Sequence, residues 1–189
     1  MTASFSLTDT TDADIPAITA IYADAVLNGT ASFELDPPDA TEMRRRFNAV
    51  RRAGYPHIVA RDGSGALLGY AYASSYRTRP AYRWSVEDSV YVAPSAKGRG
   101  VGKTLLAEII ARCEASGFRQ MVAIIGGSEH AASIGLHEAL GFAHAGTLPA
   151  TGFKHGRWLD SVLMQRPLGD GASTLPDPGT YPGTLYRPA

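Results

Sequence analysis

The segment VYVAPSAKGRGVGKTLLAEII, residues Val90–Ile110, decides the fold because it places a glycine-rich loop between a strand and a helix. The loop KGRGVGKT, residues 97–104, ends in Gly-Lys-Thr and at first suggests a nucleotide-binding phosphate loop. A Walker A loop needs a glycine five positions before Gly102, and Lys97 stands there. The dinucleotide fingerprint also fails, because its third glycine would fall on Lys103. The glycines therefore need another explanation.

The three glycines of this loop suit a site that binds an anion. Without side chains, successive backbone N–H groups can converge on an anion at the positive end of the following helix dipole. Lys97, Arg99 and Lys103 add formal positive charge around the same loop. The alternative is a flexible, solvated turn with incidental cations, and the local pattern alone leaves both interpretations open.

The bulk composition is that of a soluble globular protein. Of the 189 residues, 44% are hydrophobic and 19% are charged, and this length suits one domain or one domain and a tail. Lys and Arg together number 18, as do Asp and Glu, so the formal net charge is zero. A neutral chain has no global field that would draw it to nucleic acid or anionic lipid. We therefore expect no nucleic-acid partner.

Several classes of site and compartment are excluded by what the sequence lacks. Cys113 is the only cysteine, which excludes an intramolecular disulfide and a cysteine-rich zinc site. The polar, acidic N-terminus has no signal or transit character, and no apolar run approaches the ~20 residues that a membrane span needs. His57, His144 and His155 show no metal-ligand spacing. We expect a cytoplasmic protein with no metal and no membrane association.

Hydrophobic periodicity predicts a mixed α/β (α+β) domain with the order strand, two helices, a meander of strands, helix, strand, helix, strand. Asp12 or Asp14 is expected to cap the first helix and Gly117 to end the third. From about Gly169 the chain is rich in Pro and Gly, which indicates a surface tail rather than a second domain. The expected segments are a strand and then a helix within 4–29, a helix at 41–54, a hairpin at 57–76, a strand at 84–92, a helix at 102–117, a strand at 121–126, a helix at 131–141 and a strand at 157–168.

Several segments together carry a family resemblance. Lys97–Gly102 resembles the acetyl-CoA signature of the GNAT acetyltransferases, [Gln/Arg]-x-x-Gly-x-[Gly/Ala], and HAASIGLHEALGF at 130–142 resembles the family's second signature. Further segments resemble the phosphinothricin and methionine sulfoximine N-acetyltransferases within that family: TASFE at 30–34, YRWSVEDSVYV at 82–92 and GFKHGRWLD at 152–160. The resemblance runs from about Asp9 to Leu168. It implies a GNAT domain over 1–168, with a central, mixed, mostly antiparallel twisted sheet flanked by helices, and a Pro/Gly-rich tail over 169–189.

The resemblance implies acetyl-CoA as co-substrate. In the family, the pyrophosphate sits on the glycine loop and the pantetheine arm bonds to the backbone of the preceding strand. The roles carry over onto Val90, Tyr91 and Val92 for the pantetheine arm, and onto Gly98, Arg99, Gly100, Val101, Gly102 and Lys103 for the pyrophosphate. Lys97 replaces the usual Gln or Arg, which keeps a charge but loses bidentate geometry. His130 stands where the family usually has Asn, and Ser133 is a candidate hydrogen-bond donor to the cofactor.

Acetyl transfer to an amine needs a neutral nitrogen, and an α-amino group is mostly protonated at neutral pH, so a general base is expected beside it. Strand alternation puts Glu87 and Asp88 on opposite faces, and we expect only one of them to face the cleft. The resemblance places the base at Glu87, acting through water. The alternative is that Glu87 is a strand carboxylate paired with a nearby arginine.

The departing CoA thiolate needs a proton. Many GNAT enzymes use a tyrosine at a position that His137 occupies here. An imidazole can donate a proton near neutral pH, so His137 is the candidate general acid. The alternative is that His137 packs on the cofactor and has no proton role.

The acceptor pocket is expected to bind a small zwitterion. The resemblance assigns substrate binding to Thr30, Phe33, Glu34, Arg77, Arg79 and Tyr82. Arg77 and Arg79 suit a carboxylate or a phosphinate, and Tyr82 would form a wall that carries a hydroxyl. We expect Lys154 and His155 to lie nearby. The alternative is that these arginines only solvate a loop.

The resemblance implies direct acetylation of the α-amino group of an amino acid analogue of the phosphinothricin, methionine sulfoximine or methionine sulfone type. One alternative is an N-acetyltransferase for another small amine or for a protein N-terminus. A second alternative is a non-catalytic module that binds acyl-CoA. Relatives are usually homodimers, so a homodimer is expected, with GFKHGRW at 152–158 contributing to its interface.

Overall fold

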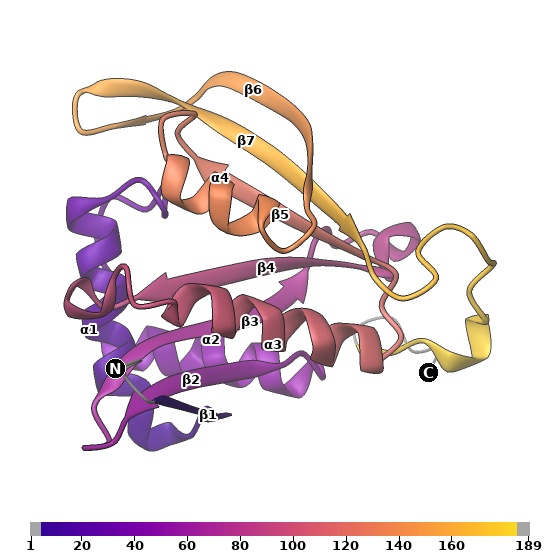
Figure 1. Cartoon of the computed structure of the whole chain (residues 1–189), viewed down its shortest axis with the longest axis horizontal. Helices are drawn as coiled ribbons and strands as arrows, with labels where there is room; N and C mark the ends of the chain where they lie inside the picture. Colours follow the sequence, from indigo (N-terminus) through magenta and orange to yellow (C-terminus); the bar gives the residue numbers. More distant parts are fainter. Residues whose placement is uncertain (1–4, 185–189) are drawn as a thin grey trace.

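The computed structural model describes residues 5–184, which form a seven-stranded sheet with helices packed on both of its faces (Figure 1). The strand order is β1-β2-β3-β4-β5-β7-β6, and neighbours are antiparallel except for the parallel pair β4 and β5. The predicted mixed, mostly antiparallel sheet is confirmed. The strands are β1 (Phe5–Asp9), β2 (His57–Asp62), β3 (Leu67–Ser75), β4 (Ser85–Val92), β5 (Gln120–Gly126), β6 (Ala143–Lys154) and β7 (Arg157–Pro167), and the helices are α1 (Ile15–Asn28), α2 (Ala40–Arg52), α3 (Val101–Ala115) and α4 (Ala131–Glu138).

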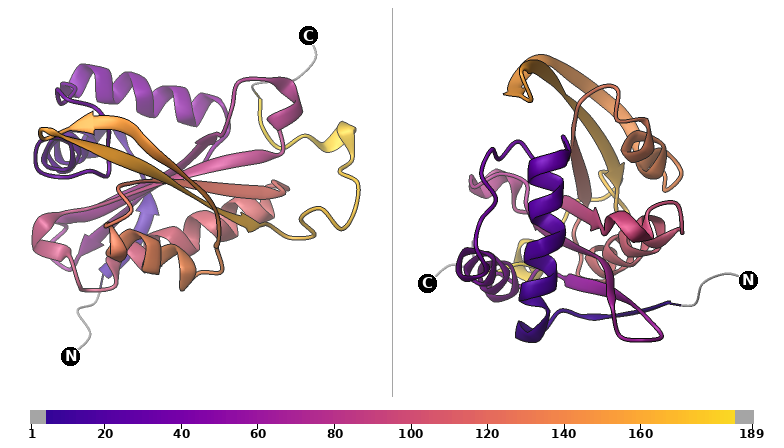
Figure 2. Two further views of the ribbon diagram at one scale, coloured as in Figure 1. Left: turned by 90° about the horizontal axis from the view of Figure 1, so that it is seen from above. Right: turned by 90° about the vertical axis from the view of Figure 1, so that its left-hand side faces the viewer.

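The helices bury their apolar faces against the sheet from two sides. Figure 2 shows α1 and α2 on one side, and α3 and α4 on the other. The sequence of α3 places Leu105, Leu106, Ile109, Ile110 and Cys113 on one apolar face, and all of them are buried. Met43 and Phe47 are the buried positions of α2. In α1 the sequence pattern predicts an apolar stripe of Ile15, Ile18, Ile21, Tyr22 and Ala25. The first four are buried, and Val26 takes the core position expected for Ala25. No helix within residues 5–184 combines the length and the apolarity that a membrane span requires.

Only one of the two predicted helix ends has the expected chemistry. Gly117 has φ +89° directly after α3, and the N–H of Phe118 donates to the carbonyl of Cys113 at 3.1 Å, which closes the helix as predicted. Asp14 precedes α1, but its side chain does not cap the helix. Its carboxylate instead accepts from the Thr11 N–H and pairs with Arg61 on β2. The expected side-chain cap is therefore wrong, because the ion pair to the sheet takes the carboxylate.

Strand β6 was not predicted. It forms the edge of the sheet beside β7, and the long β6–β7 hairpin curves over α4 (Figure 1). Most of its residues are exposed, and its pairing with β7 is irregular at His144/Gly146 and at Leu148/Gly152. A mostly exposed strand interrupted by glycine and proline lacks the alternation of apolar and polar residues that marks a half-buried strand.

The described part of the expected tail, residues 169–184, lies against the domain. The guanidinium of Arg83 stands 5.7 Å from the ring of Trp84 and 5.8 Å from the ring of Tyr181. Thr184 donates its N–H to the carbonyl of Ala53 at 3.2 Å. These contacts hold the segment after β7 beside the loop that precedes β4. The rest of the expected tail, 185–189, lies outside the described residues.

Candidate active site

A cleft opens where β4 and β5 separate. The two parallel strands pair only from Ser85 to Glu87 on β4, and beyond this point they diverge. A cavity of about 660 Å³ fills the gap, lined by both strands, the glycine loop and α4. Because β4 makes no ladder bonds to β5 beyond Glu87, its backbone groups on that edge can bond to a ligand. The cavity contains these predicted residues: Thr30, Glu87, Val90, Tyr91, Val92, Lys97, Gly98, Gly100, Val101, Gly102, Lys103, His130, Ser133 and His137.

The glycine loop has the backbone of an anion-binding loop. Gly98 has φ +76° and Gly100 has φ +80°, a conformation that glycine adopts without strain. A Cβ at either position would meet open space, so the backbone angle and not crowding selects glycine. Helix α3 starts directly after Gly100, which brings its positive end to the cavity, and Lys97 and Lys103 line the same wall. A loop of this geometry at a helix N-terminus can bind a diphosphate.

Arg99 does not share this cavity with the rest of the loop. Hydrogen bonds from Ser64 lower the pKa of Asp62 below its usual range, and the positive charge of Arg99 lowers it further. Arg99 therefore lies close to the β2–β3 turn. The sequence placed Arg99 among the cofactor-binding residues, and only its backbone remains a candidate for that role.

His130 and Ser133 stand at the start of α4. Burial, together with the nearby charge of Lys97, lowers the pKa of His130, which favours a neutral imidazole. Its Nδ1 is buried and has no hydrogen-bond partner within residues 5–184. Ser133 lines the cavity, and its carbonyl accepts a hydrogen bond from His137. These polar groups face the same space as the lysines of the glycine loop.

Glu87 and Asp88 project from opposite faces of β4, as strand alternation predicts. Glu87 is on the face of Tyr91, whose ring meets Tyr22 of α1 edge-on at 5.0 Å, whereas Asp88 is on the face of α4. Both residues line the cavity, but the Asp88 side chain is only 3% exposed and is turned to His137.

Glu87 has the environment of a proton acceptor that works near neutral pH. Burial raises the pKa of Glu87 to about 7, and the adjacent charge of Asp88 acts in the same direction. The positive charge of Arg77 opposes this rise in pKa. A carboxyl group with a pKa near the working pH is suited to general base catalysis.

Asp88 and His137 form a buried pair on the other face of β4. Nε2 of His137 lies 3.1 Å from Oδ2 of Asp88, and Nδ1 donates to the carbonyl of Ser133 at 2.7 Å. The side chains are only 5% exposed for His137 and 3% for Asp88. Burial alone would lower the pKa of His137, but the hydrogen bond and charge of Asp88, with the Ser133 carbonyl, outweigh it and raise this pKa.

The loop after α1 closes one end of the cleft. Thr30 donates its hydroxyl to the carbonyl of Gly126 at 2.7 Å. The ring of Phe33 lies so close to two glycines that a Cβ would stand 2.6 Å from it at Gly126 and 2.4 Å from it at Gly152. These close approaches explain the glycines at the end of β5 and on β6. Lys154, with Nζ 2.6 Å from the carbonyl of Ser32, ties the same loop to β6.

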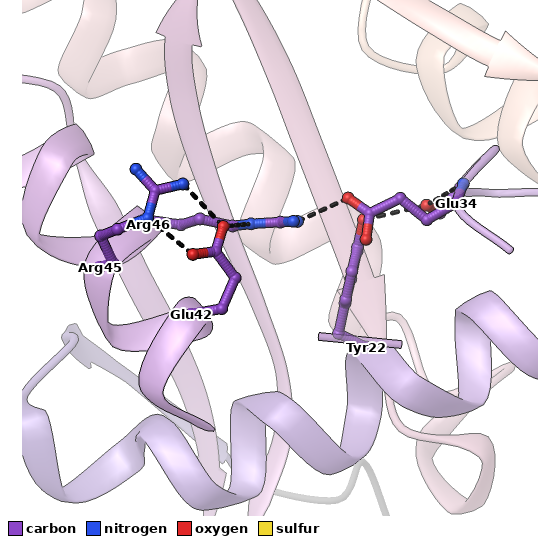
Figure 3. A network of polar contacts seen from close by, with 6 residues as sticks. Tyr22, Glu34, Glu42, Arg45 and Arg46 are labelled. Atoms are coloured by element: carbon purple, nitrogen blue, oxygen red, sulfur yellow. Dashed lines mark hydrogen bonds and ion pairs between the residues drawn. The ribbon is translucent and has the colours of Figure 1, made fainter. Parts of the chain in front are cut away.

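Glu34 faces α2 and not the cavity. Figure 3 shows its carboxylate pointing at Arg46, whose Nη1 lies 2.6 Å from Oε1 of Glu34. Arg46 also forms an ion pair with Glu42 at 2.8 Å, and Glu42 forms a second ion pair with Arg45 (Figure 3). Because this network already occupies the carboxylate, a substrate contact by Glu34 would require a rearrangement or a second interaction on the same group.

The segment between β3 and β4 carries the remaining predicted substrate residues. Arg77, Arg79 and Tyr82 do not line the cavity, and neither do Phe33 and Glu34. The Arg77 guanidinium stands 5.2 Å from the ring of Tyr76, and its positive charge lowers the pKa of Glu87. Tyr82 packs edge-on against Tyr76 at 5.7 Å. Arg77 is therefore linked to the cleft through its effect on the pKa of Glu87.

Among the cavity residues that the sequence reasoning did not assign to the site, Asp24, Asn28 and Asp88 carry polar or charged side chains. Asp24 and Asn28 of α1 line the cavity, and their polar side chains bond to each other on the exposed side of the helix. Asp88 carried a usable signal, because it interrupts the apolar row Val86, Val90 on one face of β4. A carboxylate in such a row needs a buried partner, and the sequence did not reveal that His137 supplies it.

Known proteins share the sequence and the fold of this chain. Residues 18–142 match the Acetyltransferase (GNAT) family. The chain is 60% identical over 166 residues to a phosphinothricin N-acetyltransferase of Alcaligenes faecalis, covering 88% of this chain and 84% of the relative. It is 46% identical over 162 residues to the L-methionine sulfoximine/L-methionine sulfone acetyltransferase of Pseudomonas aeruginosa, covering 86% and 94%. A phosphinothricin acetyltransferase of Sinorhizobium meliloti, crystallised in complex with AcCoA, has a TM-score of 0.94 and 55% identity over 100% of both chains.

Proposed function

The chain belongs to the GNAT acetyltransferase family, and we propose that it transfers the acetyl group of acetyl-CoA directly to the α-amino group of a phosphinothricin, methionine sulfoximine or methionine sulfone type of amino acid analogue. Its relatives support an acetyl-CoA-dependent N-acetyltransferase, and the predicted family resemblance is confirmed. The observation that carries the acetyl-transfer chemistry is Glu87, a half-buried carboxyl group at the divergence of β4 and β5 with a pKa raised to about 7. No group of three His, Cys, Asp or Glu side chains within 5–184 is placed to hold a metal.

The cleft fits acetyl-CoA, which supplies an activated thioester to the reaction. The backbone N–H groups of 98–103, with Lys97 and Lys103, would bind its diphosphate at the positive end of α3. The unpaired edge of β4 at Val90–Val92 would bond to the amides of the pantetheine arm, and a cavity of about 660 Å³ has room for such a ligand. His130 and Ser133 would contribute polar contacts from α4.

Glu87 would remove a proton from the acceptor ammonium, directly or through water. The ammonium of a free amino acid is protonated at neutral pH, and a carboxylate base with a pKa near 7 placed beside it can take its proton. The freed lone pair then attacks the thioester carbonyl. His137, on the opposite face of β4, would return a proton to the departing thiolate.

Acceptor recognition is assigned to the loops around Glu87. Arg77 and Arg79 would bind the acceptor carboxylate, with Tyr82 and Phe33 as walls and Thr30 and Glu34 at the mouth. The support for Arg77 is that its positive charge lowers the pKa of Glu87, the group that would take the amine proton. This pairing of an anion site with a base suits an α-amino acid.

We also propose a cytoplasmic homodimer in which the β6–β7 hairpin contributes to the interface. Phe153 is 57% exposed and Trp158 is 66% exposed, and their rings contact each other edge-on at 5.2 Å. An exposed aromatic pair at the tip of a hairpin is typical of an interface. Light scattering at several concentrations would test this, with Trp158→Ser expected to shift the chain toward monomer.

The test of the proposed function is thiol release from acetyl-CoA with a panel of acceptors. We expect turnover with phosphinothricin, methionine sulfoximine and methionine sulfone, and mass spectrometry should place the acetyl group on the α-nitrogen. Turnover with unrelated small amines or with peptide N-termini alone would replace the substrate class. Acetyl-CoA binding without turnover for any acceptor would indicate a non-catalytic module instead.

A further inference from the structure

We infer that the segment after β7 is a positioning element for acceptor recognition, in which Tyr181 holds the acceptor loop, residues 76–84, that carries Arg77 and Arg79. This inference rests on the proposed function, in which that loop binds the acceptor carboxylate. It gives a role to residues 169–184, which no step of the proposed reaction uses. The left panel of Figure 2 shows this segment, in yellow, running back beside the loop that precedes β4.

The acceptor loop has no buried residue of its own. Every residue from 76 to 84 is at least partly exposed, and the stretch 77–82 is fully at the surface. Its internal order comes from one short helical turn at Pro80–Tyr82 and from the ring of Tyr82, which packs on Tyr76 at 5.7 Å. A segment with few buried contacts opens at a low cost in free energy. The order of the loop therefore depends on contacts with other segments.

Tyr181 supplies such a contact where the loop joins β4. The Tyr181 ring is 9% exposed and meets the ring of Trp84 edge-on at 5.6 Å. The guanidinium of Arg83 stands close to both rings, at 5.7 Å and 5.8 Å. The backbone of Trp84 is held separately, because its carbonyl accepts from the N–H of Arg119 at 2.9 Å. The tail thus fixes the side chains of two consecutive residues at the end of the acceptor loop.

The segment after β7 is itself attached to the domain on both sides of this aromatic contact. Before it, Nη2 of Arg119 donates to the hydroxyl of Thr174 at 2.9 Å. After it, Thr184 donates its N–H to the carbonyl of Ala53 at 3.2 Å and its hydroxyl to the carbonyl of Arg52 at 3.0 Å. A segment attached at two places can hold a third group in a fixed position between them.

Arg77 connects the acceptor loop to the chemistry of the cleft. Its guanidinium stands 5.2 Å from the ring of Tyr76, and its positive charge lowers the pKa of Glu87, which burial and the charge of Asp88 raise. Tyr72 of β3 also interacts with Glu87, but burial raises the pKa of this phenol, so it stays neutral. A loosened loop should therefore weaken acceptor binding and also the effect of Arg77 on Glu87. No residue of 169–184 lines the acetyl-CoA cavity, so cofactor binding should not change.

Tyr181→Ala tests this role, because it removes the ring and leaves the loop sequence intact. We expect the KM of phosphinothricin to rise by about 5- to 20-fold, since small displacements of a positioning group are costly. The Kd of acetyl-CoA should stay within about twofold of the wild type. The acidic limb of kcat/KM against pH should move to higher pH, the direction expected when Arg77 no longer acts on Glu87. Backbone amides of 76–84 should exchange hydrogen faster.

Two control variants separate positioning from stability. Tyr181→Phe keeps the ring and should match the wild type in acceptor KM, acidic limb and hydrogen exchange. Leu175→Ala changes a side chain of the same segment that is 94% exposed, and it should also match the wild type. In an Arg77→Gln background, Tyr181→Ala should move the acidic limb no further, because the charge that the loop positions is already absent.

A folded Tyr181→Ala enzyme with the acceptor KM and acidic limb of the wild type would overturn the inference, and so would unchanged exchange at 76–84. If Tyr181→Ala does not fold, Tyr181→Leu, which keeps apolar volume but removes the aromatic faces, is measured in the same way. A wild-type enzyme that acetylates no acceptor defeats the proposed function instead. Hydrogen exchange then still reports whether Tyr181 orders the acceptor loop.

Discussion

Glu87 and Asp88 are adjacent on β4, and their carboxylates lie on opposite faces of the strand in different environments. Glu87 faces α1, and burial raises its pKa to about 7. Asp88 faces α4 and is held by His137 at 3.1 Å. One strand therefore separates a proton acceptor from a buried ion pair at the point where β4 leaves β5. In the proposed reaction, Glu87 would accept the proton of the acceptor amine from one face of this strand, and the proton for the departing thiolate would come from the other face.

The pH dependence of kcat/KM follows from Glu87. A base must be ionised to accept a proton, so activity is present above the pKa of Glu87 and is lost as pH falls through about 7. Because the charge of Arg77 lowers the pKa of Glu87, Arg77→Gln should raise that pKa. The acidic limb of the profile of kcat/KM against pH, where activity falls as Glu87 is protonated, should then move to higher pH. Arg79→Gln is the matched control, which should weaken acceptor binding without moving the limb. Superimposable limbs for wild type and Arg77→Gln would contradict this coupling.

Gly100→Ala tests the backbone of the glycine loop. Its φ of +80° is unfavourable for alanine, and open space around its Cβ leaves the backbone angle as the only cost. We expect a loss of about 1 kcal/mol in the free energy of unfolding and at least a tenfold rise in the Kd of acetyl-CoA by calorimetry. Gly65→Ala has the same kind of strain, with φ +86°, in the β2–β3 turn away from the cleft. It should lose stability but keep cofactor affinity, and equal effects on affinity would remove the special role of the loop.

Tyr181 should stabilise the domain from the segment after β7. Its ring is 9% exposed and packs edge-on against Trp84 at 5.6 Å, with Arg83 above both rings. Tyr181→Ala should lower the free energy of unfolding by about 2 kcal/mol, since it removes a buried aromatic contact and a cation–π contact. Leu175→Ala, at a side chain that is 94% exposed, should change it by less than about 0.5 kcal/mol. Equal unfolding temperatures for both variants would show that the segment contributes nothing to stability.

Local patterns predicted most of the fold. The apolar stripes of α1 and α3, the apolar runs of β2 and β3 and the alternation at Val86–Asp88 of β4 are short-range signals; the elements are confirmed, with Val26 replacing Ala25 in the stripe of α1. Strand β6 escaped prediction because its residues are mostly exposed and its pairing is interrupted near Gly146 and Gly152, so the partner strand β7 and not its own pattern defines it. The separation of β4 from β5 has no local signal either, and it creates the cleft.

The site was predictable in residue type but not in pairing. The glycine loop stands out by its own chemistry, whereas Glu87 and His137 were assigned from the family resemblance, and the structure brings all three into one cavity. The partners were not visible, since Asp88 and His137 are 49 residues apart and Glu34, in the loop between α1 and α2, meets Arg46 of α2. Long-range ion pairs depend on how the strands and helices pack, which periodicity does not encode.

The most direct test of the central claim is thiol release by Glu87→Gln with phosphinothricin as acceptor at pH 8. We predict that kcat falls by about 10²- to 10⁴-fold, the range expected for loss of a general base, and that the acidic limb near pH 7 disappears. The Kd of acetyl-CoA and the unfolding temperature should remain close to those of the wild type. A variant that retains kcat within about twofold, with the same acidic limb, would contradict the assignment of Glu87 as the base.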